Sequence, residues 1–143
     1  MDLYIFIDTV VSVLYLSLVF VSLTNKGYKR SINRLFAYLS FCLLVWLIAN
    51  HISNDTSNPP EMVVYVNYAL FAASFLTALL VTKLTVMITN NRRVSAVYQR
   101  IEPFLWLIAF VSATPLVGQG VENQGSVYGV IFGPGVSVYA IGL

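Results

Sequence analysis

Charged residues are scarce in this chain. Of its 143 residues only 10% are Asp, Glu, Lys or Arg, whereas 58% are hydrophobic. A soluble domain carries roughly 25% charged residues, so this sequence has too little charge to cover a surface that faces water. The scarcity argues against an ordinary soluble domain and indicates a protein whose main partner is a lipid bilayer.

Cysteine and histidine are almost absent as well. The one cysteine, Cys42, has no second thiol in the chain with which to form a disulfide. A zinc site needs three or four ligands, which the one histidine, His51, and a distant cysteine do not supply. No convergent catalytic set and no glycine-rich phosphate-binding motif occurs either. The sequence therefore predicts neither an enzyme nor a bound metal or cofactor.

Long uncharged runs dominate the first four fifths of the chain. A helix rises 1.5 Å per residue, so about 20 apolar residues cross hydrocarbon roughly 30 Å thick. Glu102 and Pro103 have the character of a helix start, and Thr114-Pro115 that of a kink or a helix end. We expect an all-α, polytopic membrane bundle with spans at about 3–23, 35–53, 62–82 and 103–117.

The last part of the chain changes character. Glycines recur through 118–135, which predicts an irregular outer loop that could contain a small hairpin. The segment 136–143 is apolar again, but its eight residues reach only about 12 Å as a helix. We expect it to be the start of a truncated fifth span, in a chain that is a fragment or a prematurely ended gene product.

The few charges are sorted by sign. All eight basic residues lie in the connections 24–34 and 83–102. Five of the six acidic residues lie in the alternate segments, at Asp2, Asp8, Asp55, Glu61 and Glu122. Short loops rich in Lys and Arg stay in the cytoplasm. The pattern predicts an N-terminus outside the cell, and it explains the positive net charge without a nucleic-acid partner.

Polar side chains gather near the expected outer ends of the second and third spans. They could line a small sensing cleft that comprises Asn50, His51, Tyr65, Asn67 and Tyr68. Interfacial tyrosines, and asparagines that hydrogen-bond between helices, are the plainer interpretation and the favoured one. His51 could also form a pH-sensing pair with Asp55, although an interfacial histidine that faces water is favoured over it.

Two further features of the spans bear on packing and function. Asp8 is expected one or two turns below the outer surface, where an ionisable residue raises a functional hypothesis. A side chain that simply reaches water is the favoured alternative. Small residues on the third span form two rows that predict a close helix–helix contact; they are Ala69, Ala73 and Thr77, and Ser74 and Ala78.

A family resemblance adds a functional expectation. The basic loop that leads into Asn33-x-x-Phe36 and on to Trp46 resembles the N-terminal seven-transmembrane sensor region of bacterial histidine kinases. The same family's fourth-span exit and outer loop are similar to three later segments, namely 114–117, 120–122 and 128–135. The resemblance implies an input module in the bacterial inner membrane, joined through later spans to a kinase that forms a homodimer. The family's phosphoacceptor helix and ATP-binding domain are not in this sequence.

Two alternatives come from other functional classes. One is a small transporter subunit or a transporter fragment, and the other is a structural membrane scaffold without a ligand. Transport sites usually place ionisable residues or broken helices near the middle of the membrane. The second to fourth expected spans keep their charges at their ends, which favours the sensor.

Overall fold

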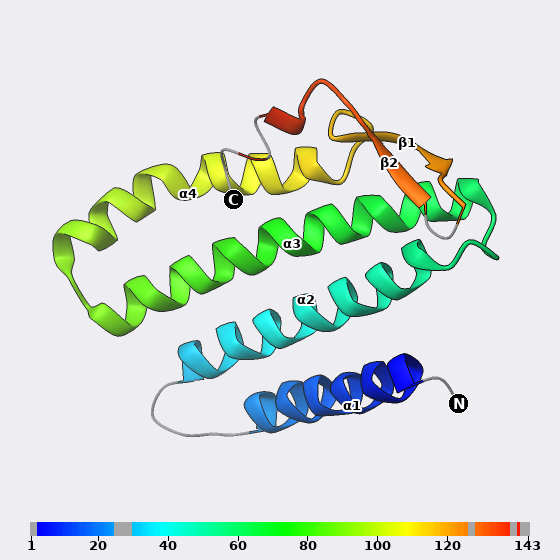
Figure 1. Ribbon diagram of the computed structural model, residues 1–143. Coiled ribbons are helices and arrows are strands. Elements are labelled where there is room, and N and C mark those ends of the chain that lie inside the picture. The colour runs from blue at the N-terminus through cyan, green and yellow to red at the C-terminus, as the bar shows by residue number, and fades with distance from the viewer. Residues whose placement is uncertain (1–2, 25–29, 126–127, 138–139, 141–143) are drawn as a thin grey trace.

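The computed structural model describes residues 3–24, 30–125, 128–137 and 140. The elements assigned within these ranges are the helices α1 (Leu3–Thr24), α2 (Arg30–Asn54), α3 (Pro60–Thr89) and α4 (Arg92–Ser112), and the strands β1 (Gly118–Asn123) and β2 (Tyr128–Phe132). The helices run antiparallel and each packs on the next in chain order, so that α1 and α4 form the two outer sides (Figure 1).

Each of the four helices is long and apolar enough to cross a membrane. Large apolar side chains cover their outward faces, and Phe20 and Phe110 are 69% and 73% exposed. Such a surface is costly in water and stable in hydrocarbon, where α-helices satisfy their own backbone hydrogen bonds. The expected multi-pass helical bundle is confirmed, while its orientation remains a prediction.

The buried seam of the bundle lies between α2 and α3, which form the most extensive helix pair. Most of the buried side chains of α2 are small, namely Ala37, Ser40, Ala49 and Ser53, and they allow a close approach of backbones. Larger apolar side chains of α3 complete the core, such as Phe75 and Leu79. Of the small residues expected to make this contact on α3, Ala73 is buried and Ala69 is exposed. The sequence analysis did not single out the small residues of α2.

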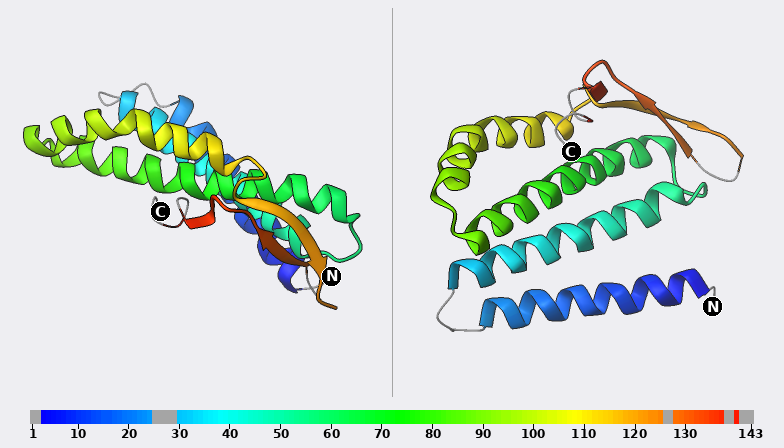
Figure 2. Two further views of the ribbon diagram at one scale, coloured as in Figure 1. Left: turned by 90° about the horizontal axis from the view of Figure 1, so that it is seen from above. Right: turned by 60° about the vertical axis from the view of Figure 1, so that its left-hand side comes forward.

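The structure corrects the expected start of the fourth helix. α4 begins at Arg92, eleven residues before Pro103, and Asn91 caps it by accepting hydrogen bonds from the backbone N–H groups of Arg93 and Val94. Pro103 therefore lies inside the helix. Its ring offers no N–H to the carbonyl of Gln99, and Figure 2 shows α4 changing direction after its first turns. The helix also ends at Ser112, before the expected limit at residue 117.

The glycine-rich segment forms an antiparallel hairpin of β1 and β2, with Asn123 opposite Tyr128. The hairpin lies along the first half of α3, beyond the point where α4 ends (Figure 1). The Phe71 and Phe132 rings are 6.3 Å apart, and the Tyr128 hydroxyl donates to the carbonyl of Asn58 at 2.9 Å. These contacts attach the hairpin to α3 and to the connection between α2 and α3.

The chain continues beyond the hairpin through a close backbone contact. The N–H of Gly133 donates to the carbonyl of Val117 at 2.8 Å, and a Cβ at this position would lie 2.4 Å from the carbonyl oxygen of Leu116. Val136, Ser137 and Ala140 have helical backbone, whereas 138–139 and 141–143 lie outside the described residues. The expected fifth span therefore remains a prediction.

Candidate functional site

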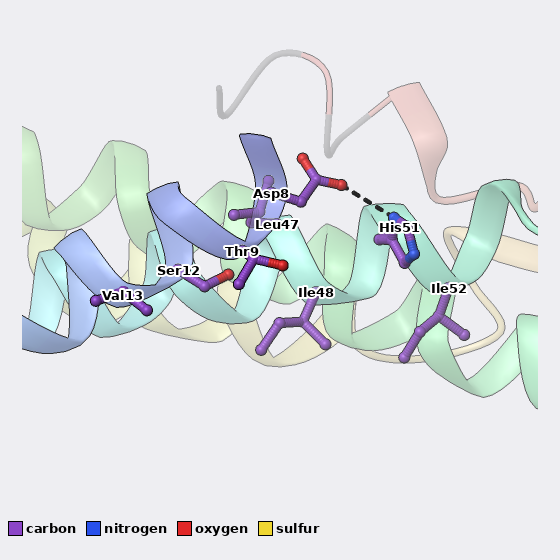
Figure 3. Close-up of a pocket in the computed structure, with 8 residues that line it drawn as sticks. All are labelled: Asp8, Thr9, Ser12, Val13, Leu47, Ile48, His51 and Ile52. Carbon is purple, nitrogen blue, oxygen red and sulfur yellow. Dashed lines mark hydrogen bonds and ion pairs between the residues drawn. The ribbon is translucent and has the colours of Figure 1, made fainter. Parts of the chain in front are cut away.

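His51, at the last turns of α2, faces α1. Its Nδ1 lies 2.9 Å from Oδ2 of Asp8, a residue 43 positions away in the sequence. Figure 3 shows the imidazole and the carboxylate directed toward each other across the two helices. Both residues were candidates from the sequence, but their pairing was not predicted. Asp55 was the partner considered for His51, and the Asp55 carboxylate instead accepts a hydrogen bond from the N–H of Ser57 at 2.9 Å.

A groove runs from this pair along the contact between α1 and α2. It has a volume of about 280 Å³ and a largely apolar lining, formed by Thr9, Ser12 and Val13 of α1 and by Leu47, Ile48 and Ile52 of α2, with Asp8 and His51 at one end (Figure 3). The side chain of His51 is 50% exposed and that of Asp8 is 34% exposed. The groove can therefore accept a small amphipathic molecule whose polar group competes for the acid or the imidazole.

Asn67, a second residue of the expected cleft, is buried between α2 and α3. Its Oδ1 accepts a hydrogen bond from the hydroxyl of Ser53 at 3.4 Å, and its Nδ2 donates to the carbonyl of Val63 at 3.0 Å. The amide is thus used in an interhelical hydrogen bond. This is the plainer of the two interpretations that the sequence offered for the asparagines.

The remaining residues of the expected cleft have other surroundings. Tyr65 is 72% exposed on the outward face of α3. Its ring meets that of Tyr68 edge to face, with the centroids 6.0 Å apart. Asn50 is half-buried on α2. The structure thus places His51 at the α1 groove, Asn67 in the α2–α3 seam and Tyr65 on the outward surface of α3.

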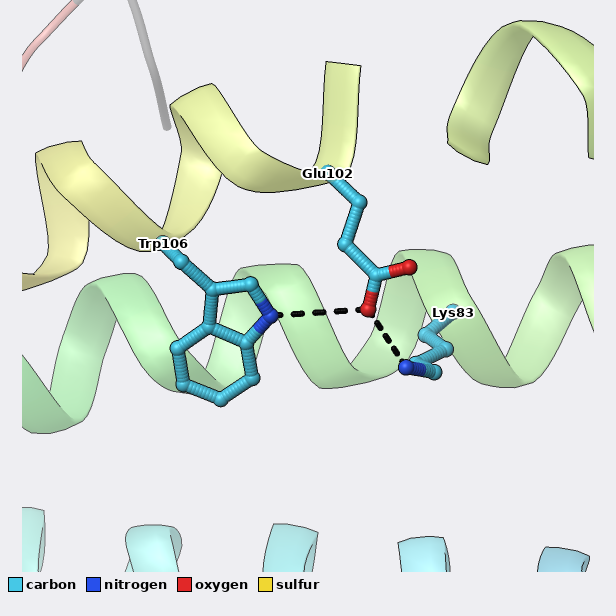
Figure 4. Close-up of polar contacts among 3 residues, drawn as sticks. All are labelled: Lys83, Glu102 and Trp106. Carbon is cyan, nitrogen blue, oxygen red and sulfur yellow. Dashed lines mark hydrogen bonds and ion pairs between the residues drawn. The ribbon is translucent and has the colours of Figure 1, made fainter. Parts of the chain in front are cut away.

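A second polar cluster joins α3 to α4, toward the opposite end of the bundle. Nζ of Lys83 lies 2.5 Å from Oε1 of Glu102, and the indole N–H of Trp106 donates to the same oxygen at 3.4 Å (Figure 4). The sequence analysis placed Lys83 and Glu102 on the same side without pairing them. The signal that could have paired them is the short turn at Asn90-Asn91, which brings residues on either side of it together along two antiparallel helices.

The two polar pairs and the groove offer groups that can bind a small molecule. Within the residues that the structure describes, no group of three or more His, Cys, Asp or Glu side chains could hold a metal ion. The Asp8–His51 pair can exchange a proton or hold a polar group, and the groove beside it can hold an apolar one. A molecule bound there would contact α1 and α2 together.

Comparison with known proteins found no matching family model, curated protein or solved structure. Function is therefore inferred from the geometry described above and from the sequence pattern.

Proposed function

We propose that this chain is a membrane-embedded input module in which a small amphipathic molecule binds between α1 and α2 and displaces α1. The observation that carries the proposal is the way α1 is held. From Phe6 to Thr24 no side chain of α1 is buried. The Asp8–His51 pair, at the end of the groove, is a polar link that joins α1 to α2.

The other three helices bury more of their side chains than α1 does. α2 and α3 share the buried seam with its Ser53–Asn67 hydrogen bond, and α3 and α4 share the core of Phe75, Leu79 and Ala109. The Lys83–Glu102 pair adds a charged contact between α3 and α4. Because stability is lowest where few groups are buried, α1 is the helix that moves against the others at least cost.

The energies involved suit a switch. A partly exposed polar pair contributes roughly 0–1 kcal/mol, so a molecule that replaces the contact between Asp8 and His51 has little to overcome. A difference of about 1.4 kcal/mol in its affinity for the two positions of α1 changes their ratio tenfold. Binding of ordinary strength is therefore sufficient to change the population of α1 positions.

The sorted charges and the family resemblance give this switch a direction. With the N-terminus outside, the groove's polar end faces the exterior of a bacterial inner membrane, and the basic helix ends face the cytoplasm. Displacement of α1 is then transmitted through the bundle to a cytoplasmic histidine kinase, which acts as a homodimer. The output lies outside this sequence, and its assignment rests on the resemblance of the basic loop, Asn33, Phe36 and the segments 114–117 and 128–135.

A chimera tests this function. The chain is joined in frame to the cytoplasmic half of a histidine kinase with a transcriptional reporter, and Asp8→Asn and His51→Gln are compared in it. Each variant replaces one partner of the same contact by a neutral amide and weakens it, so both should change the basal output severalfold and in the same direction. Val13→Ala, in the same groove without a polar role, should leave the output unchanged. Equal outputs from all four proteins, at equal membrane levels, would reject the input module.

One observation favours the alternative of a small transporter subunit. α4 changes direction after its first turns (Figure 2), contains Pro103 and ends at Ser112, and the hairpin then lies along α3. Transporters place irregular backbone of this kind where it lines a substrate path. If the chain, together with its neighbouring gene products, mediates uptake of a solute that Asp8→Asn abolishes, the transporter is supported over the sensor.

A further inference from the structure

An apolar crevice lies between α2, α3 and α4 toward the end of the bundle that carries the basic residues. Its volume is about 360 Å³, and its walls are Leu35, Tyr38, Phe41 and Cys42 of α2, Leu76, Leu80 and Lys83 of α3, and Trp106 of α4. Water would find few hydrogen-bond partners in it, and an empty crevice would forfeit dispersion contacts along three helices. A hydrocarbon chain suits these walls.

The charges around the crevice identify the other end of such a molecule. Among the described residues that line it, Lys83 is the only charged one. Arg34, which is exposed, lies one helical turn before Tyr38 on the same face of α2. The Glu102 carboxylate accepts from Lys83 and Trp106, so its charge is already opposed. The two cations outweigh this one acid, and an anionic headgroup is attracted there.

We propose that this crevice binds one anionic glycerophospholipid of the adjacent leaflet, with an acyl chain between the three helices and its phosphate beside Arg34 and Lys83. The site stands apart from the proposed function, since it lies on other helices than the α1 groove and does not depend on the orientation in the membrane. A lipid bound there would contact α2, α3 and α4 at once, and would stabilise their packing.

Tryptophan quenching by brominated lipids tests the proposal on the full chain. The sequence has two tryptophans, Trp46 and Trp106, so Trp46→Phe leaves the crevice residue as the only reporter. The protein is placed in phosphatidylcholine vesicles that contain an equal fraction of either brominated phosphatidylglycerol or brominated phosphatidylcholine. We expect stronger quenching by the brominated phosphatidylglycerol, and a smaller difference at high salt.

Three further variants distinguish a specific lipid site from a general electrostatic attraction of anionic lipids to the protein. Arg34→Gln should lower the preference for phosphatidylglycerol roughly fivefold, because one basic residue contributes about that factor. Arg93→Gln removes an equally exposed charge away from the crevice and should not change it. Cys42→Phe fills the crevice and should protect Trp106 from both brominated lipids.

Equal quenching by the two brominated lipids would overturn the proposal. It would also fail if Arg34→Gln and Arg93→Gln reduced the preference to the same extent.

Discussion

Asn67 is a buried amide in the seam between α2 and α3, and it is paired with the hydroxyl of Ser53. Polar groups inside a membrane bundle must find partners in the protein, because hydrocarbon offers none. The sequence alone gave the position of Asn67 on the third span. It did not give the direction of the side chain, which depends on how α2 and α3 are rotated about their axes.

A double-mutant cycle measures this hydrogen bond. We expect Ser53→Ala and Asn67→Ala each to destabilise the bundle, and the two together to show a coupling energy of about 0.6 kcal/mol, the usual value between membrane helices. Unfolding in mixed micelles with increasing SDS gives the four free energies. Ser112→Ala, whose hydroxyl bonds within α4, is the control for the loss of a buried hydroxyl. If the effects of Ser53→Ala and Asn67→Ala on the free energy of unfolding were additive, the hydrogen bond would contribute nothing to stability.

Asp55, in the connection between α2 and α3, gives a pH-dependent test. Hydrogen bonds from the hydroxyl and the backbone N–H of Ser57 hold the pKa of this carboxyl below its usual value. A lowered pKa means that the carboxylate stabilises the turn at pH values above the unfolded pKa. That stabilisation is lost as the pH falls through the folded pKa.

Ser57→Ala should therefore raise the pKa of Asp55 toward the usual aspartate value, while Ser57→Thr, which keeps the hydroxyl, should leave it low. The chemical shift of the Asp55 carboxyl carbon, followed by NMR in micelles from about pH 2 to about pH 6, reports the titration. An unchanged pKa in Ser57→Ala would contradict the turn described here.

Among the helices, α1, α2 and α3 were the most predictable from the sequence, and α4 was the least. Long uncharged runs predicted the first three helices because hydrocarbon thickness sets their length. The first half of α4 carries Arg92, Arg93 and Arg100, and the sequence analysis took it for a connection. The cap at Asn91 starts the helix at Arg92, and the helix continues through Pro103. Local charge and a proline were therefore misleading where capping and packing on α3 decide the structure.

The candidate site was less predictable than the elements. His51 and Asp8 were both named from the sequence, yet their contact joins residues on two helices and requires the register between α1 and α2. Asp55 was the nearer acid in sequence, and a tight turn with Ser57 engages it instead. For the glycine-rich segment the sequence predicted an irregular loop, and a hairpin was one possibility within it. Glycine is compatible with many loop conformations and favours no single one.

The close contact at Gly133 provides a test of the hairpin as an element. A Cβ there would meet the carbonyl oxygens of Leu116 and Pro115 at 2.4 and 2.6 Å, and both are backbone atoms that cannot move independently. We expect Gly133→Ala to cost roughly 1–3 kcal/mol, as overpacked sites do. Gly120→Ala places its Cβ 3.6 Å from the side chain of Ile131 and should be tolerated. Amide hydrogen exchange of β1 and β2 measures both, and equal protection in the two variants would contradict the contact.

For the whole molecule, the sorted charges make the orientation testable. The described basic side chains lie toward the end where α3 turns into α4, and Asp8, Asp55 and Glu61 lie toward the other end. In a Cys42→Ser background, Ser57→Cys should react with a membrane-impermeant maleimide added to intact cells, and Gly27→Cys should not. Labelling of Gly27→Cys from outside would reverse the orientation, and the α1 groove would then open toward the cytoplasm.

Because the buried side chains lie on α2, α3 and α4, we expect α1 to move as a unit against the other three helices. If the Asp8–His51 pair limits this movement, Asp8→Asn should widen the distances between α1 and α2 at that end of the bundle. An exposed pair contributes at most about 1 kcal/mol, so the displaced population should rise roughly fivefold or less. Spin labels at Ile7→Cys and Asn54→Cys, in a Cys42→Ser background, report the distances by pulsed EPR.

The matched pair of labels at Asn54→Cys and Met62→Cys spans α2 and α3, which the buried seam holds together, and its distance distribution should stay unchanged in Asp8→Asn. His51→Gln should reproduce the wider α1–α2 distribution, because it weakens the same contact from the other side. If both variants keep the original distribution, the apolar contacts of α1 hold the helix without the pair. Displacement of α1 from the groove could then not begin at Asp8 and His51, and the input mechanism proposed for this chain would be wrong.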